Sequence, residues 1–91
     1  MRAKNISRYT YKKTAFQGWR LALRRQGNQF VKYFADRQYE DSTAAFKAAV
    51  ALRNEILKEL KKKGAEPARV FAAANELIEQ QRRQTNKVDI G

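Results

Sequence analysis

The residues of this chain best suited to chemistry are arginines that alternate with apolar residues in the segment GWRLALRR, residues 18–25. Successive side chains of a β-strand point to opposite faces, so a two-residue period separates them into two sets. The basic set consists of Arg20, Ala22 and Arg24, and the apolar set of Trp19, Leu21 and Leu23. On a chain of net charge +11, guanidinium groups on an exposed sheet face predict binding to the phosphates of a nucleic acid.

The residue types that are missing exclude several classes of function. The chain has 91 residues and neither Cys nor His, which excludes disulfides, zinc fingers, cysteine nucleophiles and histidine-based triads. The closest acidic group, Asp36, Glu40 and Asp41, lacks the regular spacing of a calcium loop. A tyrosine nucleophile needs surrounding arginines and a general acid, and the chain is too short for such a recombinase domain. We therefore expect a binding protein and not an enzyme, with no metal, cofactor or small-molecule substrate.

The positive charge is concentrated in the first part of the chain. Residues 1–40 hold ten Lys and Arg against two acids, a net of +8, whereas residues 41–91 hold ten against seven, a net of +3. Basic residues interleaved with aromatics favour a nucleic-acid partner over a merely solvated surface. No apolar run is long enough for a transmembrane helix, and the basic start lacks the apolar segment of a signal peptide. We expect no membrane contact, and a cytoplasmic, nucleoid-associated location if the source is bacterial.

The elements that must position these residues form an α+β domain. Strands are expected at residues 5–11, 18–25 and 29–34, followed by a helix that ends near residue 63. Asp41 or Ser42 can cap this helix. Its apolar residues recur at steps of three and four, and they are Phe46, Ala49, Leu52, Ile56 and Leu60. The pattern predicts a three-stranded antiparallel sheet packed on an alanine-rich helix, plus a C-terminal helix.

The C-terminal helix follows a break at Gly64, a residue type that commonly ends helices. Pro67 suits the first turn of the new helix, and a weaker apolar stripe over residues 70–78 predicts packing on this domain or on a second copy. The second of these alternatives would allow self-association through this helix. Residues 1–64 are predicted to form the binding domain, and residues 65–91 a C-terminal helix with a tail that frays from residue 85.

The loop between the second and third strands decides which residues share a face. A two-residue loop at residues 27–28 would mix basic and apolar side chains on both faces. A three-residue loop at residues 26–28, with Asn28 in the left-handed conformation, keeps the faces distinct. Because a slip of one residue exchanges every side chain between faces, we favour the three-residue loop.

The three-residue loop assigns the side chains of both strands. It places Arg24 opposite Phe30, and Ala22 opposite Lys32. The exposed basic face is then expected to hold Arg20, Arg24, Phe30 and Lys32. The residues expected to face the helix are Trp19, Leu21, Leu23, Val31 and Tyr33.

The order of these elements resembles a known family of DNA-binding domains. The strings GWRLALRR, QFVKYF and STAAFKAAVALRNEIL are similar to those of the Apetala-type ethylene-response-factor (ERF-like) domain. The likeness is greatest to its short bacterial and phage-type members, which also occur beside homing nucleases. It covers about residues 5–60 and leaves the C-terminal third unexplained. The resemblance implies a sheet that lies in the DNA major groove, with arginines and aromatics touching bases, sugars and phosphates.

The resemblance carries over to this chain one position at a time. Arg24 matches the arginine of the family's A-E-I-R run in the second strand, and Ala22 takes the place of its glutamate, so the base preference is expected to differ. Phe30 matches the third-strand tryptophan, whereas Trp19 matches a core aromatic. Lys12, Lys13 and Thr14 replace an Arg/Trp-rich loop, and Arg8 lies in the region of the first-strand arginines. The predicted DNA-binding residues are therefore Arg8, Lys12, Lys13, Arg20, Ala22, Arg24, Phe30 and Lys32.

The leading interpretation is a sequence-preferring module that binds double-stranded DNA through its sheet in the major groove. Such a module would regulate transcription or a mobile element. Three alternatives remain open: an arm-type DNA-binding domain of a tyrosine recombinase, a basic protein associated with RNA or the ribosome, and a protein-interaction domain with an acidic partner. Competition between duplex DNA and RNA would separate these classes.

Overall fold

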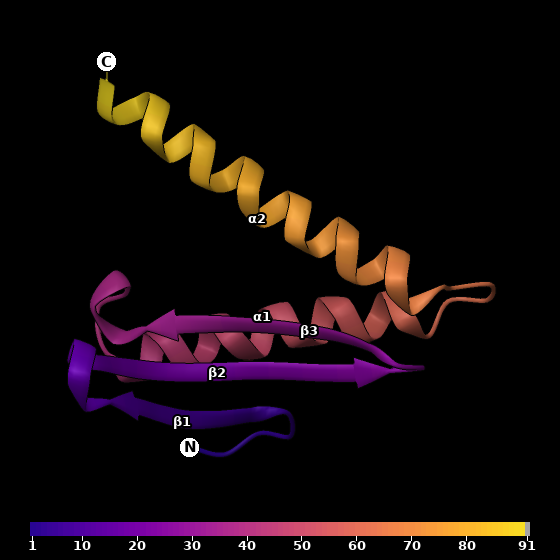
Figure 1. The fold of residues 1–91 in the computed structure, drawn as a ribbon, viewed down its shortest axis with the longest axis horizontal. Helices are drawn as coiled ribbons and strands as arrows, with labels where there is room; N and C mark the ends of the chain where they lie inside the picture. Colours follow the sequence, from indigo (N-terminus) through magenta and orange to yellow (C-terminus); the bar gives the residue numbers. More distant parts are fainter. Residues whose placement is uncertain (91) are drawn as a thin grey trace.

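The computed structural model describes residues 1–90, with the side chains of residues 1–13 and 15–81. Its elements are β1 (Ile6–Tyr11), the 3-10 turn η1 (Lys12–Thr14), β2 (Phe16–Arg25), β3 (Asn28–Ala35), the 3-10 turn η2 (Asp36–Gln38), α1 (Ser42–Leu60) and α2 (Pro67–Ile90). The strands form one antiparallel sheet in the order β1-β2-β3, and two helices follow (Figure 1). The expected fold class is therefore confirmed.

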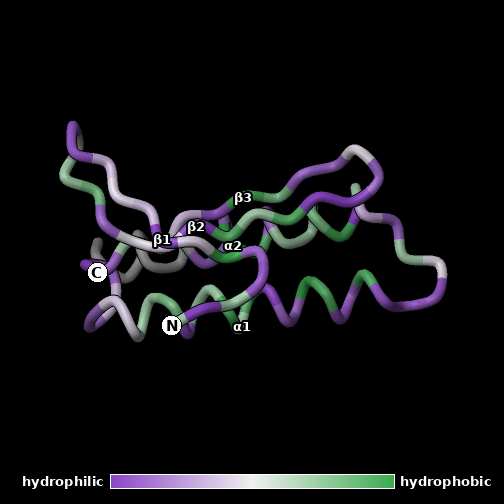
Figure 2. The backbone as a smooth tube through the Cα atoms, turned by 90° about the horizontal axis from the view of Figure 1, so that it is seen from below, coloured by the Kyte–Doolittle hydropathy of each residue, from purple (hydrophilic) through white to green (hydrophobic). Residues whose placement is uncertain are grey.

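The sheet and α1 form two layers, which Figure 2 shows edge-on. Leu21 and Leu23 point from β2 into the space between the layers and are fully buried. From the other side, Ala45 and Ala49 of α1 are also fully buried. Because alanine side chains are small, the axis of α1 lies close to the sheet and the leucines fill the remaining space.

Trp19 fixes the start of α1 against the sheet, as expected of a core residue. Its indole Nε1 donates a hydrogen bond to the carbonyl oxygen of Ser42 at 2.8 Å, and its ring lies 4.8 Å from that of Phe46, centroid to centroid. The helix begins with Asp41 as its N-cap, whose Oδ1 accepts a hydrogen bond from the Ala44 amide at 2.8 Å. Gly64, at φ +78°, follows its end.

The C-terminal helix, α2, extends the core beyond the expected domain boundary at residue 64. It starts at Pro67, as predicted, but it continues to Ile90 where a frayed tail was expected from residue 85. Phe71 is only 3% exposed, and its ring lies 5.9 Å from that of Phe30. From this contact α2 runs away from α1 beside the β3 edge of the sheet (Figure 1). The core of the sheet therefore includes a side chain from α2.

The predicted register of the β2–β3 hairpin is wrong by one residue. The loop has two residues, Gln26 and Gly27, at φ +50° and +79°, and Arg24 pairs with Gln29. Two left-handed residues in succession match the right-handed twist of the flanking strands, so the hairpin closes without a third loop residue. Asn28 pairs with Arg25 as the first residue of β3 and is not in the left-handed conformation.

The corrected register moves every β3 side chain to the face opposite to the expected one. Phe30 pairs with Leu23, and Lys32 with Leu21, so both lie on the side of the sheet that faces α1. Phe30 is 1% exposed and cannot contact DNA without unfolding. Val31 and Tyr33, which were expected to face the helix, lie on the other face with the arginines. The burial of Phe30 between Leu23 and Phe71 explains why this register is the stable one.

Candidate nucleic-acid interface

The sheet has one face that α1 does not cover, and we call it the open face. Alternation along the three paired strands assigns it Ser7, Tyr9 and Tyr11 of β1, Phe16, Gly18, Arg20, Ala22 and Arg24 of β2, and Gln29, Val31, Tyr33 and Ala35 of β3. None of these residues is an Asp or Glu. The strands therefore give the open face a cationic and aromatic character, and the carboxylate of Glu79 in α2 lies at its β3 margin, in a recess shared with Val31 and Tyr33.

Arg20 and Arg24 lie on the open face, as the sequence predicted. Arg20 pairs with Ser7 of β1 and Tyr33 of β3, so it occupies the centre of the sheet. Arg24 lies near the β2–β3 loop and is exposed. Neither guanidinium has an ion-pair or hydrogen-bond partner among the side chains that the structure describes. Both groups can donate to a ligand without first breaking an internal contact.

Ala22 lies between the two arginines on the same face, opposite Val31. A methyl group at this position leaves the neighbouring guanidinium groups unobstructed. Ala22 therefore lies on the same face as the two arginines, as the sequence predicted.

Aromatic side chains occupy the other end of the open face. They are Tyr9, Tyr11, Phe16 and Tyr33, and together they line a shallow groove that we call the aromatic cluster. The ring centroids of Tyr9 and Tyr33 are 5.2 Å apart, and Phe16 lies 6.0 Å from Tyr9 and 5.9 Å from Tyr33. The three tyrosines are 36–44% exposed. These rings pack on one another and not on the core.

Gly18 makes the aromatic cluster possible. It pairs with Tyr9 on one side and with Ala35 on the other, so rings from β1 and β3 meet across β2 above a residue that has no side chain. A Cβ at this position would clash with the carbonyl oxygen of Phe34 and would lie 2.8 Å from Cζ of Phe16. Glycine is therefore required here for close packing, since even a methyl group would displace Phe16.

Lys12 and Lys13 lie at the edge of the open face beside the aromatic cluster. They belong to η1, the turn that joins β1 to β2, and both are exposed. Ala15 ends this turn in the left-handed conformation, at φ +55°, and directs the chain into β2. The two exposed lysines therefore directly follow Tyr11 and lie at the end of the sheet that carries the aromatic cluster.

Arg8 is one of three predicted binding residues that the structure places on the other side of the sheet. It pairs with Trp19 in the β1–β2 ladder and therefore lies on the α1 side of the sheet. Its guanidinium donates two hydrogen bonds to Asp36, at 2.8 and 2.6 Å, and lies 5.1 Å from the centroid of the Trp19 ring. These bonds hold the pKa of the Asp36 carboxyl below its ordinary value and raise that of Arg8. Arg8 is thus committed to the edge of the core.

Lys32 and Phe30 also lie outside the open face. The Nζ of Lys32 is 5.1 Å from the ring centroid of Phe34, which faces α1.

The residues that the sequence analysis missed are the members of the aromatic cluster. The sequence pattern that could have indicated them is the two-residue spacing of Tyr9 and Tyr11 in β1 and of Val31 and Tyr33 in β3. This pattern assigns the residues to the open face only when the register of the hairpin is known.

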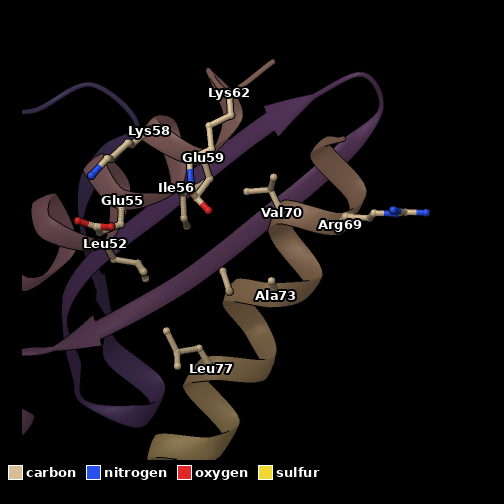
Figure 3. A pocket seen from close by; sticks show the side chains of 11 residues that line it. Leu52, Glu55, Ile56, Lys58, Glu59, Lys62, Arg69, Val70, Ala73 and Leu77 are labelled. Atoms are coloured by element: carbon tan, nitrogen blue, oxygen red, sulfur yellow. The ribbon is translucent and has the colours of Figure 1, made fainter. Parts of the chain in front are cut away.

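A second recess lies between the two helices. Leu52 and Ile56 of α1 face Val70 and Leu77 of α2 across it (Figure 3). Its rim carries charges of both signs, and one pair, Lys62 Nζ and Glu59 Oε2, is joined at 2.5 Å. Three basic and two acidic residues line this recess, so it has no strong excess of positive charge, and its apolar floor offers no donor to a polyanion. The open face is therefore the candidate interface.

Among the side chains that the structure describes, those of residues 1–13 and 15–81, no group of three acidic residues could hold a metal ion. Within the described part of the chain, no helix has the length and hydropathy to cross a membrane. No protein-family model, curated protein or solved structure matches this chain. The assignment of a function therefore rests on the residues and geometry of the open face.

Proposed function

We propose that this chain is a double-stranded-DNA-binding module that places the open face of its sheet in the major groove. The observation that carries the proposal is the pair of uncommitted guanidinium groups of Arg20 and Arg24 on a sheet face to which the strands contribute no carboxylate. Guanidinium groups pair with phosphate oxygens and with the O6 and N7 acceptors of guanine. A cationic face attracts a nucleic acid and also attracts a protein with an acidic surface, so charge alone does not decide the class of partner.

The dimensions of the sheet support duplex DNA. Adjacent strands lie about 4.8 Å apart, so the outer strands of a three-stranded sheet are separated by roughly 10 Å. The major groove of B-form DNA is about 12 Å wide, whereas that of an RNA duplex is narrow and closed to side chains. Arg20, at the centre of the sheet, is then directed to base edges. Lys12 and Lys13, at its margin, are directed to phosphates.

The resemblance to ERF-like domains remains a prediction that leads to the same mode of binding. The resemblance and the open face both assign Arg24 to DNA contact. They differ at Phe30, because the side chain that would match a DNA-facing tryptophan is in the core. A binding module of this kind has no catalytic centre of its own, and it acts on DNA in the cytoplasm if the source is bacterial.

Selection from a random duplex library at physiological salt tests the proposal. We expect enrichment of a defined site, with duplex RNA and single-stranded DNA of the same sequence competing poorly. If about five phosphates are neutralised, log K should fall with log salt at a slope of roughly −4 to −5. Equal competition by RNA would instead support an RNA- or ribosome-associated protein. Loss of all nucleic-acid binding at physiological salt would leave a protein-interaction domain.

A further inference from the structure

The aromatic cluster has no role in the hydrophobic core, and its exposure requires another explanation. Its rings lie on the side of the sheet away from α1, and the three tyrosines are more than a third exposed. Exposed aromatic area in water is unfavourable, so a grouped set of half-exposed rings indicates a surface that a ligand covers. Gly18 adds to this indication, because its missing side chain lets Phe16 and both flanking tyrosines form one continuous groove.

The orientation of the rings distinguishes between two uses of aromatic side chains in binding nucleic acids. Stacking on unpaired bases needs exposed, flat ring faces. In the aromatic cluster the planes of Tyr9, Phe16 and Tyr33 are inclined to one another by 60–87°. Inclined rings that pack on one another leave a shallow, open groove with apolar walls, which suits a small apolar group that rests against it.

The position of the cluster places it next to the arginine that is directed to base edges. Tyr33 pairs directly with Arg20 across β2 and β3, and side chains in such a pair are about 5 Å apart. Successive bases on one DNA strand are about 3.4 Å apart along the helix axis. A base contacted by Arg20 and a base contacted by Tyr33 are therefore separated by one or two steps.

The major groove offers one apolar group to such a surface. Its base edges carry nitrogen and oxygen donors and acceptors, and the exception is the C5-methyl group of thymine. We infer that the aromatic cluster, centred on Tyr9, Phe16 and Tyr33, binds the C5-methyl group of a thymine one or two steps from the base that Arg20 contacts. The charge on the same face argues for this occupant, because Arg20 brings the phosphate-rich duplex to the groove. The inference rests on the proposed function and adds a specificity element to it.

Deoxyuridine substitution tests the inference at the level of one methyl group. In the duplex site obtained by selection, each thymine is replaced in turn by deoxyuridine, which pairs identically but lacks the methyl group. We expect one or two positions beside the Arg20-dependent base at which the full-length protein binds about fourfold more weakly, the effect of burying one methyl group. Thymines elsewhere in the site should show no change.

Variants of Tyr33 show whether the cluster is the origin of this preference. Tyr33→Ala should bind the thymine and deoxyuridine duplexes equally, whereas Tyr33→Phe, which keeps the ring, should retain the fourfold difference. Thermal melts establish that both variants are folded, and the wild-type comparison needs no variant at all.

The outcomes separate this inference from the proposed function. If the wild-type protein binds the site tightly in an Arg20-dependent manner but does not distinguish thymine from deoxyuridine, the inference is wrong and the proposed function stands. A selected site without thymine near the Arg20-dependent base would also overturn it. Failure to bind any duplex would overturn both.

Discussion

The two faces of the sheet are built from alternate residues of the same strands and have opposite properties. On the face toward α1, Leu21, Leu23 and Phe30 are at most 1% exposed. On the open face, Arg20 and Tyr33, which pair with one another, are both accessible to solvent. The comparison shows that one period-two pattern can supply a core and an exposed surface of arginines and aromatic residues, with no additional element needed for the second.

The largest effect that follows from this comparison concerns Phe30 and Tyr33, which lie three residues apart in β3 and therefore on opposite faces of the sheet. Phe30→Ala removes a fully buried ring between two layers and should lower the free energy of unfolding by about 3–5 kcal/mol. Tyr33→Ala, on the other face, should lower the free energy of unfolding far less, because Tyr33 is 43% exposed. Chemical denaturation of both variants measures the difference. Similar losses for the two would mean that the faces are not distinct.

A second effect on stability tests whether the core extends into α2. Phe71→Ala removes the ring that packs on Phe30 and should destabilise the protein by about 3 kcal/mol or more. Leu77→Ala is the matched control on the same helix, because Leu77 is 53% exposed and should cost little. A fragment of residues 1–64 lacks both side chains. If this fragment were as stable as the whole chain, the contact between Phe71 and Phe30 would contribute nothing.

The next effect concerns binding without a change in stability. Arg20→Ala and Arg24→Ala should each weaken binding to the selected duplex by about 1–3 kcal/mol, with unchanged melting temperatures. A double variant of Lys47 and Lys61 to Ala removes two exposed charges from the helical side of the molecule and serves as the control. Titrations at one salt concentration compare the pairs. Equal losses of affinity in the lysine double variant and in a double variant that combines Arg20→Ala with Arg24→Ala would indicate a general charge effect and not a defined interface.

The smallest effect lies at the edge between the faces, where Arg8 holds Asp36. The pKa of the Asp36 carboxyl is below its ordinary value of 3.8, chiefly because Arg8 donates hydrogen bonds to it. The stabilisation from this pair is therefore complete above pH 3.8 and is lost as the pH falls through the lower pKa of the folded state. Because the pair is partly exposed, it contributes at most about 1 kcal/mol. The difference in unfolding free energy between wild type and Asp36→Asn, measured from pH 7 to pH 2, should shrink toward zero in acid.

Much of the fold could be predicted because its signals are local. The caps and stops of α1, Asp41 and Gly64, and the start of α2 at Pro67 are set by residue types within one turn of each boundary. The alternation of Arg20 and Arg24 with leucines likewise assigns the side chains of β2 to the two faces of the sheet. The register of β3 could not be predicted in this way, because Gln26 adopts a left-handed conformation that glutamine does not commonly favour.

The site was predicted in part for the same reason. Arg20, Ala22 and Arg24 share a strand whose faces the sequence distinguishes. The aromatic cluster brings together β1, β2 and β3, so it depends on two registers and on the absence of a side chain at Gly18. Arg8 was misplaced because its partner, Asp36, is 28 residues away along the chain. Contacts between residues so far apart in the sequence form only when the whole sheet has folded.

The position of α2 beside β3 also bears on how the chain behaves in crowded solution. The outer edge of a sheet carries unpaired amide and carbonyl groups that can recruit a strand from another molecule and so begin aggregation. Asn75, Ile78 and Glu79 of α2 line a common recess with Val31 and Tyr33 of β3, which places the helix next to that edge. At the opposite edge, β1 is short and carries Arg8. The helix therefore hinders another molecule from pairing with the β3 edge. A chain shortened before Pro67 should precipitate more readily than the intact one.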